Sequence, residues 1–396
     1  MKIAFFTENW TYGGNSIFAE DLINSFTVKK NKLEFFMNHE AIINKNRFSK
    51  NVKIKKVFIY NFMAIIQNFS TKFFGIKNLH RIFFFLKPVT YLINLFNTYV
   101  LLKKKNFDLV IVFNGGYPAS DFCLSAIRSA SFLKIPSILV IAGTPLSRRI
   151  LAYPYELFLD KMINKHASLV VANSNYQISE LIKLRNFSIS KTRVLYNGIK
   201  LRKYQNKKKF IKKNVFTLGV ACRLDKDKDI ISLIRACVFL SKNQIKYKLI
   251  IIGDGPEKFY LEKIVSNEEL ISKNVEFKGY IKTNLDRYIS KFDAYIFPSL
   301  NEGMPYSILE AAKNYIPIIT TDAGGISEFI IHRKTGIVVK KQSPKDIAKA
   351  VIFLLKNQSI SLKLVNNSYK LLRKNFEIEK MKKEFREISN NVVNKL

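Results

Sequence analysis

Residues 301–325 read NEGMPYSILEAAKNYIPIITTDAGG, and this segment indicates the fold class more clearly than any other. Two acids, Glu302 and Glu310, lie on either side of Pro305, a residue that suits the first turn of a helix. The β-rich run IPIIT and a Gly-Gly turn follow directly. This order of acidic loop, helix, strand and glycine turn is typical of α/β folds that hold a ligand at the carboxyl ends of parallel strands.

The rest of the chain alternates in the same way between apolar runs of strand length and segments with helical spacing. Continuous apolar runs indicate parallel strands that are buried on both faces. The strands that we expect are residues 2–6, 108–113, 137–141, 168–172, 215–220, 247–252, 275–277, 294–297 and 316–320. Residues 200–214 are highly charged and lack periodicity, so they are the best candidate for a linker. We therefore predict an α/β protein of two doubly wound Rossmann-like domains that face a cleft, with a helical tail.

Composition narrows the class of protein. The 396 residues are enough for two domains, and 48% of them are hydrophobic. The three cysteines, Cys123, Cys222 and Cys237, show no paired spacing, which indicates a reducing compartment. The four histidines form no metal-ligand pattern. The N-terminal strand is too short and too polar for a signal peptide, so we expect a cytoplasmic protein.

The net charge of +36 is spread over both halves of the chain. An A+T-rich genome would explain the abundant lysine and asparagine, while the functional interpretation is attraction to an anionic membrane or an acidic glycan. Nucleic acid is the weakest partner, because the sequence shows no groove-reading motif. The apolar run 82–102 is broken by Lys87-Pro88 and by two asparagines, so it does not suit a membrane span. We expect a core helix or an interfacial helix, on a protein peripheral to the inner face of the cell membrane.

Two loops carry the residues that we expect to act on a ligand. Glu302 is expected in a loop that reaches the cleft and Glu310 further into the helix, where carboxylates can bind sugar hydroxyls while the helix N-terminus meets phosphates. In CRLDKDKD, residues 222–229, Arg223 and Lys228 can both reach one anion such as a diphosphate. The acids of that segment alternate with lysines, so we interpret them as solvated charges rather than metal ligands.

Glycine turns after two strands are weaker evidence. Gly253 and Gly255 in IIGDGPE, and Gly13-Gly14 after the first strand, allow the backbone to approach a phosphate, but a plain turn explains them almost as well. The sequence contains neither G-x-x-x-x-G-K-[ST] nor G-x-S-x-G, which argues against a P-loop nucleotidase and an α/β-hydrolase.

Taken together, these motifs resemble glycosyltransferase family 4, a group of retaining enzymes with the GT-B fold. The matching segments are Gly13-Gly14, Asn197-Gly198-Ile199, Arg223 with Lys228, the turn at 253–256, the two glutamates and TDAGGISE at 321–328. The chain departs from the family pattern where Lys200 replaces an acid, and where Cys222 and Asp229 replace glycines. Ala142 is nearest to the place where many relatives have a histidine.

The resemblance implies a domain organisation and a reaction. Residues 1–198 would bind the acceptor, residues 199–360 would bind the donor, and helices in 361–396 would pack back on the first domain. The implied enzyme is a metal-independent, retaining glycosyltransferase of the hexosyltransferase type, without cofactors. Its donor would be a nucleotide sugar, with a UDP-sugar favoured, and its acceptor a glycan or a lipid-linked sugar in cell-surface polysaccharide biosynthesis, such as lipopolysaccharide or capsule.

The resemblance also implies roles for individual residues. Arg223, Lys228 and Glu302 would be catalytic, with the two cations on the donor diphosphate and Glu302 on the donor sugar. Glu310 would bind the ribose, and the chain near Tyr280-Ile281 would lie along the edge of the nucleotide base. The implied donor-binding residues are Gly13, Gly14, Asn197, Gly198, Gly253, Gly255, Tyr280, Ile281, Met304, Pro305, Tyr306 and Glu310.

Two alternatives remain open at the level of sequence. A basic glycan- or membrane-binding protein with a decayed transferase site would fit the departures at Cys222, Asp229 and Ala142. A sugar-nucleotide epimerase or hydrolase of the same fold would favour acid–base carboxylates or histidines in the cleft, and the chain offers few of these.

Overall fold

The computed structural model describes the chain except for residues 9–12, 29–30, 39–43, 58–85, 202–213 and 396. The chain forms two compact units. The first unit consists of Met1–Tyr196 together with Met381–Leu396, and the second of Asn197–Lys380. Most of the predicted linker, residues 200–214, lies outside the described residues.

The first unit is built on a seven-stranded sheet in the order β3-β2-β1-β4-β5-β6-β7, with parallel pairing throughout. Its strands are β1 (Lys2–Thr7), β2 (Lys32–Asn38), β3 (Val52–Val57), β4 (Leu109–Asn114), β5 (Ser137–Ile141), β6 (Leu169–Ala172) and β7 (Thr192–Val194). Its helices are α1 (Gly14–Asn24), α3 (Lys87–Lys103), α4 (Asp121–Phe132), α5 (Tyr153–His166) and α6 (Asn175–Arg185), with short 3₁₀ turns η1 (Ser25–Val28), η2 (Lys45–Arg47), η4 (Ile150–Ala152) and η5 (Ile189–Lys191).

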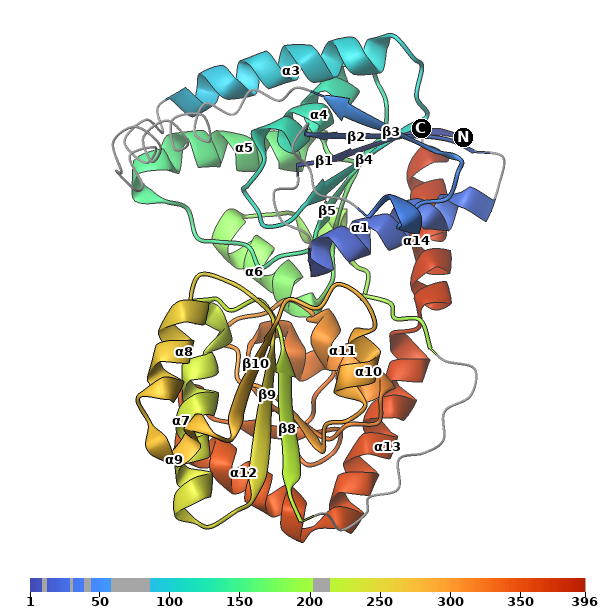
Figure 1. The fold of residues 1–396 in the computed structure, drawn as a ribbon. Helices are drawn as coiled ribbons and strands as arrows, with labels where there is room; N and C mark the ends of the chain where they lie inside the picture. Colours follow the sequence, from blue (N-terminus) through green and yellow to red (C-terminus); the bar gives the residue numbers. More distant parts are fainter. Residues whose placement is uncertain (9–12, 29–30, 39–43, 58–85, 202–213, 396) are drawn as a thin grey trace. The chain divides into compact units, whose positions relative to one another are not determined.

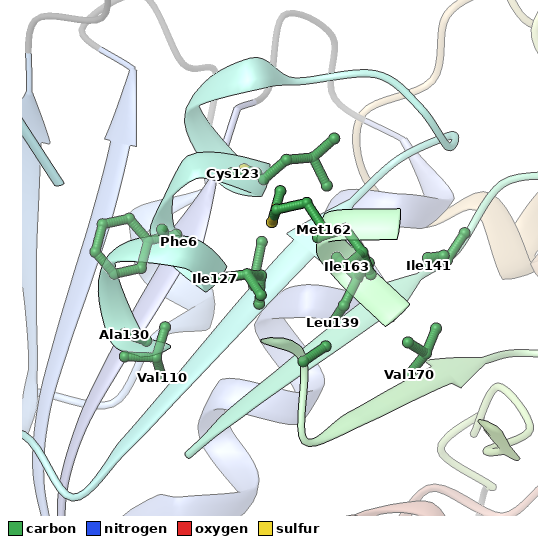
Figure 2. Close-up of a cluster of buried hydrophobic side chains, with 14 of the residues drawn as sticks. Phe6, Val110, Cys123, Ile127, Ala130, Leu139, Ile141, Met162, Ile163 and Val170 are labelled. Carbon is green, nitrogen blue, oxygen red and sulfur yellow. The ribbon is translucent and has the colours of Figure 1, made fainter. Parts of the chain in front are cut away.

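The core of the first unit lies between this sheet and the helices α4 and α5. Figure 2 shows Val110, Leu139 and Val170 of the strands beneath Ile127 of α4 and Ile163 of α5. Each of these five side chains is at most 1% exposed. The strands are buried on both faces, which is why they read as continuous apolar runs in the sequence.

The second unit repeats the plan with a six-stranded parallel sheet in the order β10-β9-β8-β11-β12-β13. Its strands are β8 (Phe216–Ala221), β9 (Tyr247–Ile252), β10 (Val275–Gly279), β11 (Ala294–Phe297), β12 (Ile318–Thr321) and β13 (Ile337–Val339). Its helices are α7 (Ile230–Lys242), α8 (Lys258–Ser266), α9 (Glu269–Ser272), α10 (Leu285–Ile289), α11 (Tyr306–Lys313), α12 (Pro344–Lys356) and α13 (Gln358–Asn375), with 3₁₀ turns η6 (Lys226–Lys228) and η7 (Gly324–Glu328). Helices cover both faces of the sheet (Figure 1), so the prediction of two doubly wound α/β units is confirmed.

The C-terminal helices divide between the two units. In α14 (Ile378–Val393), Phe385 packs edge-on against Phe26 at 5.6 Å between ring centroids, and Arg386 donates from Nη1 to the Ser25 carbonyl oxygen at 3.0 Å. The preceding helix α13 belongs to the second unit, where Tyr369 stacks on Tyr315 at 4.2 Å. We expected the C-terminal helices, residues 361–396, to pack back on the first domain. In the structure, only the chain from Met381 joins the first unit, because α13 buries its apolar side against α11.

The apolar run 82–102 forms part of α3, although residues 82–85 lie outside the described part. Pro88 does not break the helix, because it occupies the first turn, where proline is tolerated. Tyr91, Thr98 and Leu102 are buried, so α3 serves as a core helix on one side. Within the described ranges, no helix combines the length and the apolar character that crossing a membrane requires.

Candidate functional site

The candidate site lies at the carboxyl edge of the second sheet. Strands β8, β11 and β12 are parallel neighbours, so the loops that follow them emerge at the same edge. The loop after β8 contains Arg223 and Lys228, and the loop after β11 contains Glu302. The backbone N–H of Leu300 donates to the Asp227 carbonyl oxygen at 2.7 Å, which joins these two loops.

Glu302 and Lys228 form an ion pair at the centre of this edge. Their side chains are only 12% and 20% exposed, so water screens the pair less than it would a surface pair. The Ser299 hydroxyl lies 2.8 Å from Glu302 Oε1, and Lys228 Nζ lies 5.8 Å from the centroid of the Phe297 ring. The Gly325 N–H donates to the Glu302 carbonyl oxygen at 3.0 Å, which attaches the loop after β12. The two predicted residues are therefore held in contact by three loops.

Cys222 lies beside this pair, and its thiol is expected to be unreactive. Burial raises the pKa of its thiol to about 12; the positive charge of Lys228 opposes this rise and the negative charge of Glu302 adds to it. The thiolate is the nucleophilic form of cysteine, so a thiol with this pKa stays protonated at neutral pH. The cysteine that replaces a family glycine thus adds no nucleophile to the site.

Arg223 is placed differently from Lys228. Its Nε pairs with Asp225 Oδ2 at 3.1 Å within its own loop, and more than half of its side chain is exposed. The structure therefore brings together two of the three predicted catalytic side chains, Lys228 and Glu302. The role of Arg223 stays a prediction.

Asp229 occupies the other position where the family pattern has glycine. Its backbone φ is 48°, in the left-handed region that glycine adopts most easily and that aspartate tolerates better than most residues. The loop after β8 thus keeps a glycine-like turn directly before α7, despite the substitution.

The segment Met304–Pro305–Tyr306 begins helix α11, with Pro305 at the N-cap. The side chain of Asn197, 2% exposed, donates from Nδ2 to the Met304 carbonyl oxygen at 2.6 Å, and its Oδ1 is buried without a hydrogen-bond partner in the described residues. Asn197 therefore fixes the backbone from which the N–H groups of the first helical turn project. These groups carry partial positive charge and are suited to an anion.

Glu310 lies inside α11, half-buried and four residues after Tyr306, so the two side chains share one face of the helix. Gly198 follows Asn197 directly, and the next residue, Ile199, donates its N–H to the Phe376 carbonyl oxygen at 2.8 Å. This bond anchors the start of the second unit on the chain that follows α13.

Gly253 and Gly255 approach another loop closely. A Cβ at Gly253, where φ is 140°, would lie 1.8 Å from the Cys222 carbonyl oxygen, and a Cβ at Gly255 would lie 2.5 Å from that of Leu224. The Leu224 N–H donates to the Asp254 carbonyl oxygen at 2.9 Å. The close backbone approach that we predicted for a phosphate is made to the Cys222–Leu224 backbone, so packing alone accounts for both glycines.

The remaining predicted donor-binding residues lie in two places. Tyr280 and Ile281 follow β10 at the same edge of the second sheet, with Tyr280 exposed and Ile281 half-buried. Gly13 and Gly14 belong to the first unit, at the start of α1. Gly13 has an extended φ of −172°, and a Cβ there would meet no atom within 4 Å. Neither strain nor crowding requires glycine at this position, and its role stays a prediction.

Sequence reasoning missed Ser299, which is fully buried against Glu302, and it missed a pocket in the first unit. This pocket has a volume of about 290 Å³, and its polar lining includes Glu8, Lys87, Ser120, Asp121, Arg149 and Arg185. In the sequence, Asp121 is recognisable only as an acid in a loop, which does not indicate a pocket. Arg185 is fully buried and pairs with Glu156 at 2.8 Å, a contact between residues 29 positions apart that spacing cannot reveal.

The hydrogen bond of Asn197 predicts a measurable loss of stability. Asn197→Ala is expected to lower the free energy of unfolding by about 1–2 kcal/mol, because the buried Met304 carbonyl loses its donor. The matched control is Asn243→Ala, which removes an Nδ2 bond to the Phe239 carbonyl oxygen at an exposed site. The control is expected to cost less than about 0.5 kcal/mol. Equal losses in denaturant titrations of the two variants would contradict a fixing role for Asn197.

Two family models match the chain. The model described as Glycosyl transferases group 1 matches residues 202–371, and the one described as Glycosyltransferase Family 4 matches residues 70–203. An uncharacterized glycosyltransferase of Methanocaldococcus jannaschii is 30% identical over 260 residues, which are 62% of this chain and 64% of that protein. The N-acetylgalactosamine-N,N'-diacetylbacillosaminyl-diphospho-undecaprenol 4-alpha-N-acetylgalactosaminyltransferase of Campylobacter jejuni is 28% identical, with coverage of 57% of this chain and 61% of that one.

Solved structures show the same fold. HepE of Anabaena in complex with UDP superposes with a TM-score of 0.74 at 16% identity, over 99% of this chain and 100% of that one. The lipopolysaccharide outer core galactosyltransferase WaaB superposes with a TM-score of 0.69 at 20% identity, over 100% of both chains. The Methanocaldococcus and Campylobacter relatives match this chain over less than two thirds of their own length.

Proposed function

Because the chain belongs to glycosyltransferase family 4, we propose that it transfers a sugar from a nucleotide-sugar donor to a glycan or lipid-linked acceptor. The observation that carries this proposal is the Lys228–Glu302 pair at the carboxyl edge of the second sheet, within the loops that begin α7 and α11. A cation, a carboxylate and a helix N-terminus at one sheet edge are the groups that a diphosphate and a sugar need.

Each residue has a task in this proposal. Lys228 neutralises the charge that develops on the leaving diphosphate, and the backbone N–H groups of the first turn of α11 assist it. Glu302 accepts hydrogen bonds from hydroxyls of the donor sugar, and Glu310 from those of the ribose. Arg223 is free to turn toward the diphosphate only after its exposed pair with Asp225 opens, which costs little because exposed ion pairs are weak.

The reaction that we propose retains the anomeric configuration and needs no metal. The acceptor oxygen attacks on the face from which the diphosphate leaves, and a donor phosphate oxygen takes the acceptor proton. The carbon–oxygen bond to the diphosphate breaks as the bond to the acceptor forms. This route requires the protein to orient the reactants and to stabilise charge, and the Lys228–Glu302 site can do both. It requires no separate general base.

The comparisons support a donor and an acceptor class. The neighbouring HepE structures were obtained with UDP and with UDP-glucose, which favours a UDP-sugar for this chain. The Campylobacter relative is named for a diphospho-undecaprenol acceptor, and relatives in Bacillus subtilis and Staphylococcus aureus for teichuronic acid and capsular polysaccharide. We propose a lipid-linked or cell-surface glycan acceptor and attachment of the protein to the inner face of the cell membrane.

A panel of UDP-, GDP- and ADP-sugars tests the proposal, with nucleotide release and thermal unfolding as readouts. One donor is expected to stabilise the protein, by about 2.7 kcal/mol at a hundredfold excess over its Kd. EDTA is expected to change nucleotide release by less than about twofold, because no step uses a metal. NMR of the product is expected to show retained configuration. Absence of stabilisation and of release with every donor would favour the decayed binding protein instead.

A further inference from the structure

The outer layer of the first unit exposes an unusual amount of apolar surface. Helices α3, α4 and α5 lie together on one face of the sheet (Figure 1). Along α3, Phe96 is 68% exposed, and Val89 and Leu92 lie on the same face at helical spacing. In η4, at the start of α5, Ile150 is 91% exposed and Leu151 is 70% exposed. Solvent-facing positions of a helical layer are normally polar, so this surface needs an explanation.

Contacts between aromatic rings connect α3 with both of its neighbouring helices. The buried ring of Tyr91 in α3 packs at 5.7 Å against Phe158 of α5, which is itself half exposed. On the other side, Tyr99 of α3 packs at 6.5 Å against the exposed Phe132 of α4. We define the α3–α5 patch by the exposed residues Val89, Leu92, Phe96, Phe132, Ile150, Leu151 and Phe158.

The charges around the patch have a single sign. In residues 86–105, 121–133 and 146–166, the acids are Asp121, Glu156 and Asp160. Glu156 and Asp160 are at most 2% exposed, and Asp121 accepts a hydrogen bond from the Tyr155 hydroxyl at 2.7 Å. The exposed charged residues of the same segments are all basic: Lys103, Lys104, Arg149, Lys161 and Lys165.

We infer that the α3–α5 patch docks the first unit on an anionic lipid surface. This inference rests on the proposed function, because it names the surface by which such an enzyme would reach a lipid-linked acceptor. Apolar side chains gain free energy in the interfacial region of a bilayer, while the surrounding lysines are attracted to anionic headgroups. A nucleic acid would satisfy the lysines and leave the side chains of Ile150 and Phe96 in water, so the apolar component favours a bilayer.

Flotation with vesicles of phosphatidylcholine alone, or mixed with phosphatidylglycerol, tests the inference on the full chain. Wild-type protein is expected to float with the mixed vesicles. The variant Ile150→Ser/Leu151→Ser is expected to bind at least about tenfold more weakly, because it removes two exposed apolar side chains that would enter the interfacial region of the bilayer. The matched control, Phe259→Ser/Tyr260→Ser, alters two exposed aromatic residues of α8 in the second unit and is expected to bind as the wild type does.

A second pair of variants isolates the charge. Lys161→Glu/Lys165→Glu in α5 is expected to abolish the preference for anionic vesicles, whereas Lys345→Glu/Lys349→Glu, the same exposed spacing in α12, is expected to retain it. Failure of the wild type to float, or equal binding by the patch variants and their controls, would overturn the inference. So would a dimer in sedimentation velocity that the Ile150→Ser/Leu151→Ser variant dissociates, because the patch would then join two copies.

The donor assay separates this inference from the proposed function. Nucleotide release from the preferred donor, measured without vesicles, is expected to be the same in the wild type and in Ile150→Ser/Leu151→Ser. If flotation fails while release and donor stabilisation persist, the docking surface is wrong and the transferase proposal stands. If flotation succeeds while no donor binds, the transferase proposal fails.

Discussion

Replacing Lys228 by alanine is expected to lower kcat/KM for sugar transfer by about 10²–10³. The ammonium group is the cation that the structure holds against Glu302, and the proposal assigns it to the leaving diphosphate. Its loss removes a charge that acts in the transition state and leaves a mostly buried carboxylate beside the donor phosphates. Steady-state nucleotide release with the preferred donor measures the effect.

The control for Lys228→Ala is Lys226→Ala, which alters a lysine two residues earlier in the chain. Lys226 lies in the same turn η6 and is exposed, so Lys226→Ala removes the same charge from the same loop. It is expected to change kcat/KM by less than about twofold, because exposed charges are screened. A double-mutant cycle with Glu302→Gln adds a second check, since residues that act as a unit give non-additive losses. Full turnover by Lys228→Ala would remove this residue from the mechanism.

Gly253→Ala is expected to destabilise the second unit by about 3 kcal/mol or more. The added Cβ would lie 1.8 Å from the Cys222 carbonyl oxygen, which is backbone and cannot swing away, and the φ of 140° is unfavourable for alanine. Chemical denaturation followed by circular dichroism measures the loss.

Gly279→Ala separates the two causes, because Gly279 also has a positive φ, 66°, but has open space around its Cβ position. This control is expected to cost about 1 kcal/mol, the strain of a left-handed alanine alone. If Gly253→Ala were as stable as the wild type and nevertheless failed to bind the donor, the glycine would serve the ligand and the packing account would be wrong.

Sequence patterns predicted the strands of both sheet centres and the loops of the candidate site. Apolar runs such as residues 108–113 stand out because strands buried on both faces need no polar residue. The patterns missed β2, β3, β7 and β13. β2 (KLEFFMN) and β3 (VKIKKV) mix lysine and other polar residues with apolar ones, and β7 and β13 have only three residues each. β3 and β7, which contain charged residues, lie at sheet edges, where such side chains are tolerated, and β13 lies at the edge of the second sheet.

The contacts of the site were less accessible to sequence reasoning. The proximity of Lys228 and Glu302, which are 74 positions apart in the sequence, follows from strand order, because β8 and β11 are neighbours in the sheet. The pairing of Arg223 with Asp225 depends on side-chain orientation in one loop, which spacing does not encode. The packing role of Gly253 required the position of the Cys222 carbonyl, a contact between two loops.

Donor binding at the Lys228–Glu302 pair is tested most directly by the equilibrium affinity for UDP and UDP-sugars, measured by isothermal titration calorimetry on the wild type, Lys228→Ala and Lys226→Ala. We expect binding by the wild type and by Lys226→Ala, and a loss of at least about tenfold in affinity for Lys228→Ala, since a charge-assisted contact to a phosphate is removed. Wild-type affinity in Lys228→Ala would contradict the claim that the donor diphosphate binds at the Lys228–Glu302 pair.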